Sequence, residues 1–287
     1  MIYLLAIGSA ALYGAADFTG GIASRRSGAI PVVLLSQASG LVLLALVLPF
    51  LPSASPARSD MLWGAAAGLI GGIGVALLYR ALAIGIMAVV APTTAICAVA
   101  IPVVISMLLG ERPVRLALLG IALGIVSILL VSRQNAAPQS ERGEASSPRS
   151  GSGVGIALVS GVAIGFFFLS LARTSPDSGM WPLLAARAVA VALFVAVAIA
   201  GAHSLRMPSG VVALAFGCGA IDTLANAMYV LAARQGPLSV VVTLSSLYPA
   251  STVLLARVVL GERLSSWQVT GVGCALAAIM LIVSSSG

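Results

Sequence analysis

Charged residues are scarce in this sequence: they make up 8% of its 287 residues, whereas about a quarter is usual in globular proteins. Lysine is absent, and there is one histidine, His203. The three cysteines, Cys97, Cys218 and Cys274, lie in apolar stretches without metal-ligand spacing. The scarcity of charge excludes an ordinary soluble domain. Nothing indicates a metal centre or a disulfide framework, so we expect reduced cysteines that serve in packing.

Apolar residues take the place of the missing charge. They make up 60% of the chain, and the mean hydropathy is +1.13. A transmembrane helix needs roughly 20 such residues, and ten runs approach that length. We therefore predict an all-α membrane protein with ten transmembrane helices. The predicted spans are 2–23, 30–51, 61–82, 87–109, 114–132, 153–172, 180–201, 210–233, 237–260 and 266–284.

One polar segment interrupts the apolar pattern after the fifth span. Residues 133–152 are rich in Ser, Pro, Gly, Gln and Arg and are too polar to bury a core. We predict that they form a disordered linker. The linker separates a first five-helix unit, residues 1–132, from a second one, residues 153–287.

A short motif occurs at matching places in the two units. Residues 109–112 and residues 260–263 both read Leu-Gly-Glu-Arg, and each lies between the last two spans of its unit. The copies are 151 positions apart (residue 262 against residue 111). The same offset relates Gly14 to Gly165, Ser27-Gly28 to Ser178-Gly179, Pro31 to Pro182, Gly85 to Gly236 and Gly120 to Gly271. A single offset across both units indicates duplication of the whole unit.

The odd number of helices in each unit determines how the units relate. Because five helices leave the chain on the opposite side, the second unit is inverted with respect to the first. Two inverted five-helix repeats, with a solute site between them near mid-membrane, are typical of secondary transporters. The arginines of the loops leave open which side the termini face. Glu111 and Glu262 are expected to cap their turns or to pair with neighbouring arginines, without touching a solute.

This arrangement, with a Gly-Glu-Arg turn in each half, resembles the drug/metabolite transporter superfamily and, within it, the bacterial EamA-type branch. The resemblance covers nearly the whole chain except the linker. It implies a multi-pass protein of the bacterial cytoplasmic (inner) membrane that exports or exchanges small organic metabolites, amino acids or drugs. It also implies a central cavity lined by spans 1, 3, 4, 6, 8 and 9. No cofactor and no nucleic-acid partner are expected, and the protein should be a monomer or a weak homodimer.

Four ionisable residues fall within the predicted spans, where charge is costly and often functional. From a rise of 1.5 Å per residue, Asp222 and Arg187 reach a comparable middle depth, and Asp17 and Arg80 lie toward one membrane face. Each acid thus has an arginine that it could meet. Such pairs either stabilise the bundle or are broken by solute or protons during transport. Arg80 could instead extend to the membrane interface.

Other polar residues share helix faces with these acids. Asn226 and Tyr229 follow Asp222 at i+4 and i+7, and Tyr13 precedes Asp17 by four residues. Residues at these spacings lie on one side of a helix. A carboxylate, an amide and a phenol on one face have no use toward lipid, so we interpret the Asp222 stripe as a binding or coupling surface.

Spans 4 and 9 each combine proline with polar residues. A proline inside a transmembrane helix frees a backbone carbonyl, which neighbours or cavity water must satisfy. These spans are equivalent in the repeat. They form either static packing kinks or hinges that line the site. The polar candidates are Thr93, Thr94, Ser245 and Tyr248.

The sequence therefore predicts a secondary transporter, in the direction of export, for small amino-acid-like or drug-like solutes, with protons as a possible coupling ion. An uptake permease or facilitator stays an alternative. An intramembrane enzyme is disfavoured because the one histidine lies in a predicted loop and no catalytic pairing is evident. A passive channel is disfavoured because nothing resembles a carbonyl filter or a charged ring.

Overall fold

The computed structural model describes residues 2–51, 54–108, 115–132, 153–202, 204–235, 241, 244, 245 and 247–284. The Glu111 turn and the predicted linker lie outside these residues, as does most of the first half of the predicted ninth span.

The described chain is helical, and it contains ten α-helices and no strand. Each predicted span contains a described helix, of which α10 covers the second half of the ninth span, and this confirms the all-α prediction. Two short 3-10 helices, η1 (Leu48–Phe50) and η2 (Pro176–Ser178), lie in connections. The α-helices are α1 (Ile2–Ser27), α2 (Ala29–Val47), α3 (Arg58–Ile84), α4 (Met87–Leu108), α5 (Arg115–Ser132), α6 (Val154–Leu171), α7 (Trp181–Ala200), α8 (Ser209–Gln235), α10 (Tyr248–Val259) and α11 (Ser266–Ser284).

Six helices in the described ranges are long and apolar enough to cross a membrane: α1, α2, α3, α6, α7 and α8. Shorter apolar segments lie in α4, α5, α10 and α11. Many large apolar side chains on these helices are exposed, among them Leu4, Phe50, Leu62 and Ile199. Such surfaces suit lipid rather than water. The chain is a multi-pass membrane protein.

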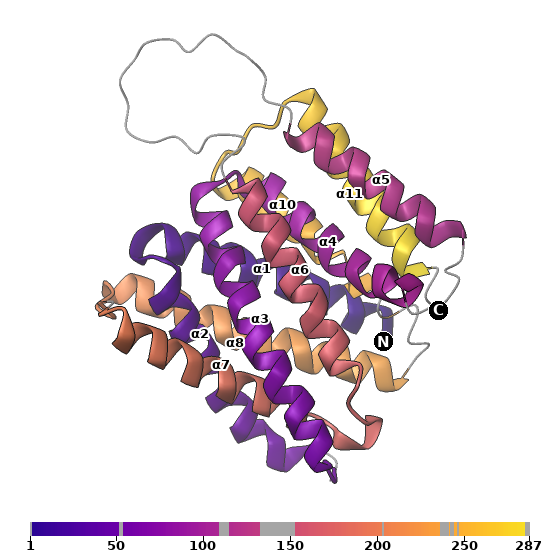
Figure 1. Cartoon of the computed structure of the whole chain (residues 1–287). Helices are drawn as coiled ribbons and strands as arrows, with labels where there is room; N and C mark the ends of the chain where they lie inside the picture. Colours follow the sequence, from indigo (N-terminus) through magenta and orange to yellow (C-terminus); the bar gives the residue numbers. More distant parts are fainter. Residues whose placement is uncertain are drawn as a thin grey trace.

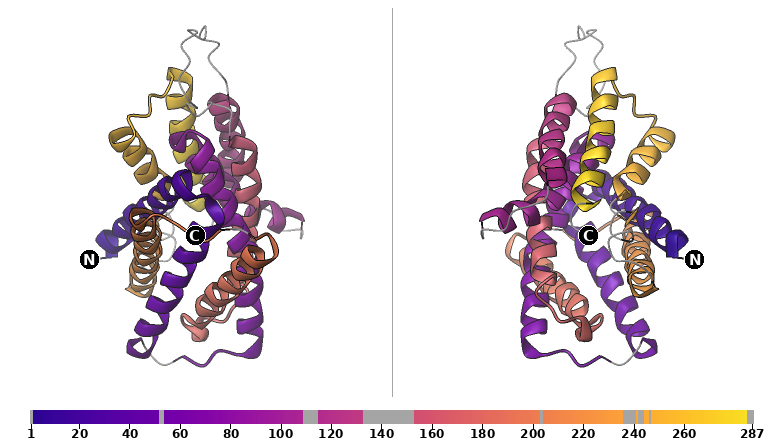
Figure 2. Two further views of the ribbon diagram at one scale, coloured as in Figure 1. Left: turned by 90° about the vertical axis from the view of Figure 1, so that its left-hand side faces the viewer. Right: turned by 90° about the vertical axis from the view of Figure 1, so that its right-hand side faces the viewer.

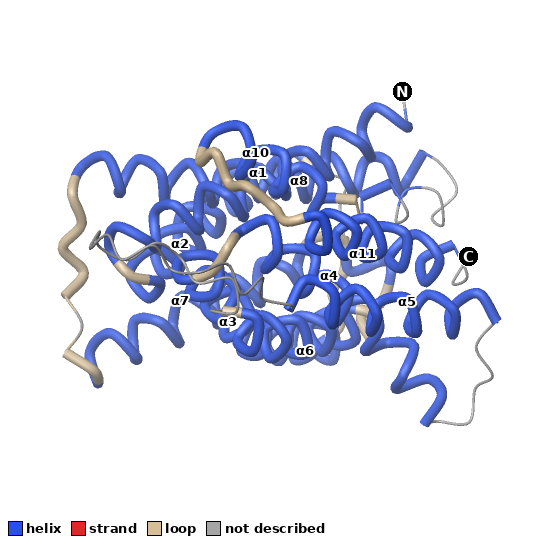
Figure 3. The backbone as a smooth tube through the Cα atoms, turned by 90° about the horizontal axis from the view of Figure 1, so that it is seen from above, coloured by secondary structure: helices blue, strands red, loops and turns tan. Residues whose placement is uncertain are grey.

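The most extensive helix packing joins the first five helices to the last five. α1 packs on α8 and α10, while α6 packs on α3 and α4. α2 contacts α7 and α8, and α5 contacts α11. Figure 1 and Figure 3 show α5 beside α11 at one end of the bundle and α2 beside α7 at the other. Both views of Figure 2 show the indigo α1 beside the orange α8. The two halves are therefore interleaved.

One contact between α5 and α11 occurs twice, at positions related by the offset of 151. A Cβ on Gly120 would lie 2.9 Å from the carbonyl oxygen of Ala278. In the corresponding place, Ser127 Oγ donates to the carbonyl of Gly271 at 2.6 Å. The offset carries residue 120 to 271 and residue 127 to 278, so these contacts between α5 and α11 are images of one another.

Small residues allow α3 to approach α7 closely. A Cβ on Gly64 would lie 2.4 Å from the carbonyl oxygen of Pro182, and one on Gly68 would lie 2.1 Å from that of Ala186. Both distances are far inside van der Waals contact with backbone atoms. Close backbone approach over small residues is a usual basis of helix association in membranes.

Replacing Gly68 by Ala should therefore destabilise the fold, because α7 would have to move away from α3. We expect a loss of about 1–3 kcal/mol, the usual range for overpacking. Gly217→Ala in α8 is the matched control, because a Cβ there meets nothing within 4 Å. Thermal unfolding in detergent measures both variants, and equal midpoints for the two would contradict the packing argument.

Candidate functional site

A part-buried ion pair lies at the junction of α2, α7 and α8. Arg187 of α7 donates through Nη2 to Asp222 of α8 and through Nη1 to Gln37 Oε1 of α2 at 3.2 Å. The missing side chain of Gly40 leaves room for the guanidinium. The predicted pairing of Asp222 with Arg187 is confirmed. Buried ions are stable when paired and hydrogen-bonded in this way.

The predicted stripe on α8 continues from this pair. Asn226 Nδ2 donates to the Asp222 backbone carbonyl at 2.7 Å and to Asp222 Oδ2 at 3.2 Å. Tyr229 is half-buried and packs against a small cluster that contains Ala6 of α1 and Ala232 of α8. The face that bears these residues is therefore directed at α1, with which α8 packs along its length.

The α1 side of this interface carries its own polar residues. The Tyr13 ring meets the Tyr248 ring of α10 edge to face, with centroids 6.4 Å apart. Asp17 lies one turn further along α1, next to Ala16, whose carbonyl accepts from the Cys218 thiol at 3.2 Å; Cys218 lies one turn before Asp222 on α8, so Asp17 and Asp222 lie at the same part of the α1–α8 contact. Both Tyr13 and Asp17 are half-buried. The structure thus brings together Tyr13, Asp17, Arg187, Asp222, Asn226, Tyr229 and Tyr248, a set that we call the central polar cluster.

The predicted pairing of Asp17 with Arg80 is wrong. Arg80 is exposed, and the described residues contain no ion pair between it and Asp17. Tyr79, the preceding residue, is buried against Gly20 of α1, and its hydroxyl lies 2.9 Å from Cys218 Sγ. Because successive helical residues point about 100° apart, the face of α3 toward α1 belongs to Tyr79 and Arg80 points outward.

The polar residues of α4 take no part in the cluster. The Thr93 hydroxyl donates to the Val89 carbonyl of its own helix at 2.8 Å, and Thr94 donates to the Ala157 carbonyl of α6 at 3.2 Å. Both are buried, and Thr94 serves helix packing. α4 contains Pro92 and Pro102, so the predicted proline-bearing helix is present.

Ser245 occupies the corresponding region of the second half. Its hydroxyl lies 2.8 Å from that of Ser9 in α1, and both serines are buried. Thr252 Oγ1 of α10 donates to the Gly14 carbonyl of α1 at 3.1 Å. These bonds hold α10 and the residues before it against α1, next to the Tyr13–Tyr248 contact.

Three members of the polar interior were not singled out from the sequence. Gln37 supports Arg187, and Tyr79 and Cys218 form a linked pair, in which the Cys218 thiol also donates to the Ala16 carbonyl at 3.2 Å. Gln37 is a polar residue inside a very apolar helix, and this position indicates a buried partner. The described residues contain no group of three or more His, Cys, Asp or Glu that could hold a metal ion.

A second charged assembly ties the two halves together at one end of the bundle. Glu262 Oε1 accepts from Met87 N at 3.1 Å and from Arg25 Nη2 at 3.3 Å, and Oε2 accepts from Ala88 N at 3.0 Å. Arg25 also donates to the carbonyls of Leu82 and Gly85 at the end of α3. We call this assembly the Glu262 junction.

The Glu262 junction satisfies two helix ends at once. The carboxylate lies at the N-terminus of α4, and the guanidinium lies at the C-terminus of α3, which are the favourable positions for each charge. The predicted role of Glu262 in capping or pairing with an arginine is thus confirmed. Its arginine comes from α1, however, and it caps a helix of the other half.

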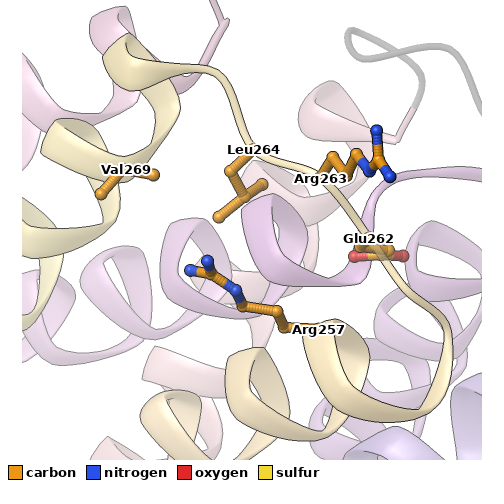
Figure 4. A pocket seen from close by; sticks show the side chains of 5 residues that line it. All are labelled: Arg257, Glu262, Arg263, Leu264 and Val269. Atoms are coloured by element: carbon orange, nitrogen blue, oxygen red, sulfur yellow. The ribbon is translucent and has the colours of Figure 1, made fainter.

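A pocket of about 350 Å³ lies beside this junction and is lined by Arg257, Glu262, Arg263, Leu264 and Val269. Figure 4 shows the two guanidinium groups pointing in different directions. The pocket lies at the turn between α10 and α11, and its one acid is already occupied by Arg25 and the α4 amides. It therefore lies apart from the central polar cluster.

The fold and the central polar cluster define a multi-pass helical membrane protein with a charged site in an apolar interior. The model of the EamA-like transporter family matches residues 151–284, so the C-terminal half belongs to that family, within the drug/metabolite transporter superfamily. This confirms the resemblance predicted from the sequence. No curated protein matches the chain.

A solved structure described as "Crystal structure of protein" is 17% identical and has a TM-score of 0.55. The similarity covers 99% of this chain and 96% of that one. It shows a shared fold over the whole chain, including the half that the family model does not match.

Proposed function

We propose that this protein is a secondary transporter that moves a small organic solute across the bacterial cytoplasmic membrane by alternating access, in the direction of export. The observation that carries the proposal is the central polar cluster, which lies between α1 and α8 in a chain whose C-terminal half belongs to a transporter family. Charged groups inside a membrane bundle mark solute or ion pathways. An uptake permease or facilitator would use the same site, with the flux reversed or uncoupled.

Two inverted repeats, residues 1–132 and 153–287, are part of the proposal. The paired contacts between α5 and α11 support it, since they exchange under the offset of 151 positions. So do Gly28 and Gly179, which occupy equivalent turns and both have positive φ, 80° and 56°. Two similar halves can exchange conformations, which opens the site to each side in turn.

The Glu262 junction is the proposed gate at one end of the site. It links α1, α3 and α4 to the turn between α10 and α11 through charge-assisted hydrogen bonds. Tyr79, whose hydroxyl contacts Cys218 of α8, lies one turn of α3 from Leu82 in this junction. Opening the path at this end requires these bonds to break.

Solute flux into proteoliposomes tests the function directly. Flux that saturates with solute and responds to an imposed proton gradient supports a coupled transporter, and saturable flux without that response supports a facilitator. Counterflow, in which internal solute accelerates uptake of labelled external solute, is expected of alternating access. A purified, folded protein that moves no solute of a broad panel would overturn the proposal.

Labelling of single cysteines tests the inverted repeat. Arg26 and Asp177 are both exposed and are related by the offset of 151 positions. In a background without the three native cysteines, we expect Arg26→Cys and Asp177→Cys to react with an impermeant reagent from opposite sides of the membrane. Reaction of both from the same side would contradict inversion.

A further inference from the structure

The charges of the central polar cluster are unequally exposed. The Asp222 side chain is 34% exposed, whereas that of Arg187 is 6% exposed. The guanidinium lies behind the carboxylate, against Gln37 and in the gap at Gly40. Its Nε is buried and has no acceptor. The acid is therefore the accessible member of the ion pair.

Asp17 adds a second acid to the central polar cluster. It is half-buried on α1, near Asp222, and no ion pair to Asp17 occurs within the described ranges. With both carboxylates ionised, the cluster has two negative charges and one positive charge, a net charge of −1. A buried net charge is costly unless a counter-charge approaches it. A proton or a cationic solute would supply that counter-charge.

Aromatic rings surround the two acids. Tyr13 and Tyr248 are in contact, and Tyr229 lies two turns from Asp222 on the same face of α8. All three tyrosines are half-buried, so part of each side chain remains accessible. The face of a tyrosine ring attracts cations, and ammonium groups bind well among such rings.

We propose that the transported solute carries a positive charge: it is an organic cation, whose ammonium group binds between Asp17 and Asp222 against the rings of Tyr13 and Tyr248. This inference rests on the proposed function and adds the charge of the solute to it. The apolar part of the solute would lie along the tyrosine rings. Arg187 does not touch the solute in this arrangement; it positions Asp222.

The argument favours a cation over an anion and over an uncharged solute. An anion would face two carboxylates, and like charges in a poorly solvated site repel strongly. An uncharged solute would compensate the net charge of the cluster only if a proton bound with it. A zwitterion would need a second cation for its carboxylate, and the nearest one, Arg187, is already bound by Asp222.

Permanently charged probes test the proposal, because they have no neutral form that could cross the bilayer unaided. Tetraalkylammonium ions from tetramethyl to tetrabutyl are compared with alkyl sulfonates of similar size and with betaine. We expect at least one tetraalkylammonium ion to raise the thermal unfolding midpoint of the purified protein, as ligands of the folded state do, and the sulfonates and betaine to leave it unchanged. The proposal would be overturned if a sulfonate or betaine stabilised the protein, or if none of the probes did.

Variants assign the effect to the cluster. Asp17→Asn should weaken the apparent affinity for the stabilising cation by about tenfold or more, which corresponds to about 1.4 kcal/mol. Asp177→Asn, at an exposed loop position, should leave it unchanged. Equal affinities in the two variants would refute the placement of the cation at Asp17.

Flux measurements separate this inference from the proposed function. If liposomes containing the protein take up sulfonates or neutral solutes in an Asp222-dependent way, the protein is a transporter but its solute is not a cation. If a cation stabilises the protein but is not transported, the charge of the site is correct and the proposed transport of this cation is wrong.

Discussion

Replacing Asp222 by Asn should abolish solute flux. Asp222 joins the functional elements of the cluster, because it accepts from Arg187 of α7 and from Asn226 of its own helix and interacts with Asp17 of α1. Loss of its charge removes a partly exposed acid and leaves the Arg187 charge without its counter-ion. We expect flux at least tenfold below that of the wild type in proteoliposomes.

The single variant is also expected to be less stable, and this effect must be separated from transport. Breaking a buried ion pair on one side costs about 3–5 kcal/mol, because the remaining charge is buried without compensation. The double variant Arg187→Gln with Asp222→Asn removes both charges and should recover most of this stability. If the pair is purely structural, flux should recover in the double variant together with its stability.

If Asp222 is part of the transport site, the double variant will fold and insert but will remain inactive. Thermal unfolding and flux are therefore measured on the wild type, both single variants and the double variant. Wild-type flux in the double variant would show that the pair is structural and that the site assignment is wrong.

Replacing Glu262 by Gln should open one end of the bundle. The substitution removes the charge that binds Arg25 and the amides of Met87 and Ala88. Hydrogen bonds to charged groups contribute about 1.5–3 kcal/mol each. A shift of about 1.4 kcal/mol toward the open form is a tenfold change in its population. The open form should therefore become readily detectable.

Cys218 reports on this opening without an added label site. It is buried next to Tyr79, close to the junction, and it is free. In a background in which Cys97 and Cys274 are replaced by Ser, we expect an impermeant thiol reagent to label Cys218 about tenfold faster in Glu262→Gln than in the parent. Arg25→Gln should also speed the labelling of Cys218. Arg26→Gln, at an exposed position, should leave the labelling rate unchanged. If Glu262→Gln lowers the unfolding midpoint but leaves the labelling rate of Cys218 unchanged, the Glu262 junction is a structural contact and not a gate.

The helices were predictable because a membrane places one strong demand on a sequence, a run of apolar residues of the right length. The pairing of Asp222 with Arg187 followed from depth, since both lie near the middle of their spans. Depth alone failed for Arg80, because the rotation of α3 about its axis directs Tyr79, not Arg80, toward α1. The rotation of a helix about its own axis is determined by packing against several neighbours. It cannot be predicted from the hydropathy of a span that is apolar on all sides.

Contacts between segments far apart in the chain could not be predicted from the sequence either. Arg25 and Glu262 stand 237 positions apart, and each has nearer partners in the sequence that it does not use. The repeat predicted that the two Gly-Glu-Arg turns are equivalent, but not that Glu262 caps a helix of the other half. Gln37 was not predicted because its span, residues 30–51, contains no ionisable residue, although burying an unpaired amide in an apolar helix is also costly.

The interleaving of the halves has a consequence for biosynthesis. When α1 to α5 have entered the bilayer, the groups that they later bury against α6 to α11 still lack their partners. Gly14, Gly64 and Gly120 lack the helices that pack on them, Ser9 lacks Ser245, and Arg25 lacks Glu262. The N-terminal half is thus an unfinished protein during translation, held in the membrane by its hydrophobicity alone. Separately synthesised halves should be degraded when alone and accumulate when made together.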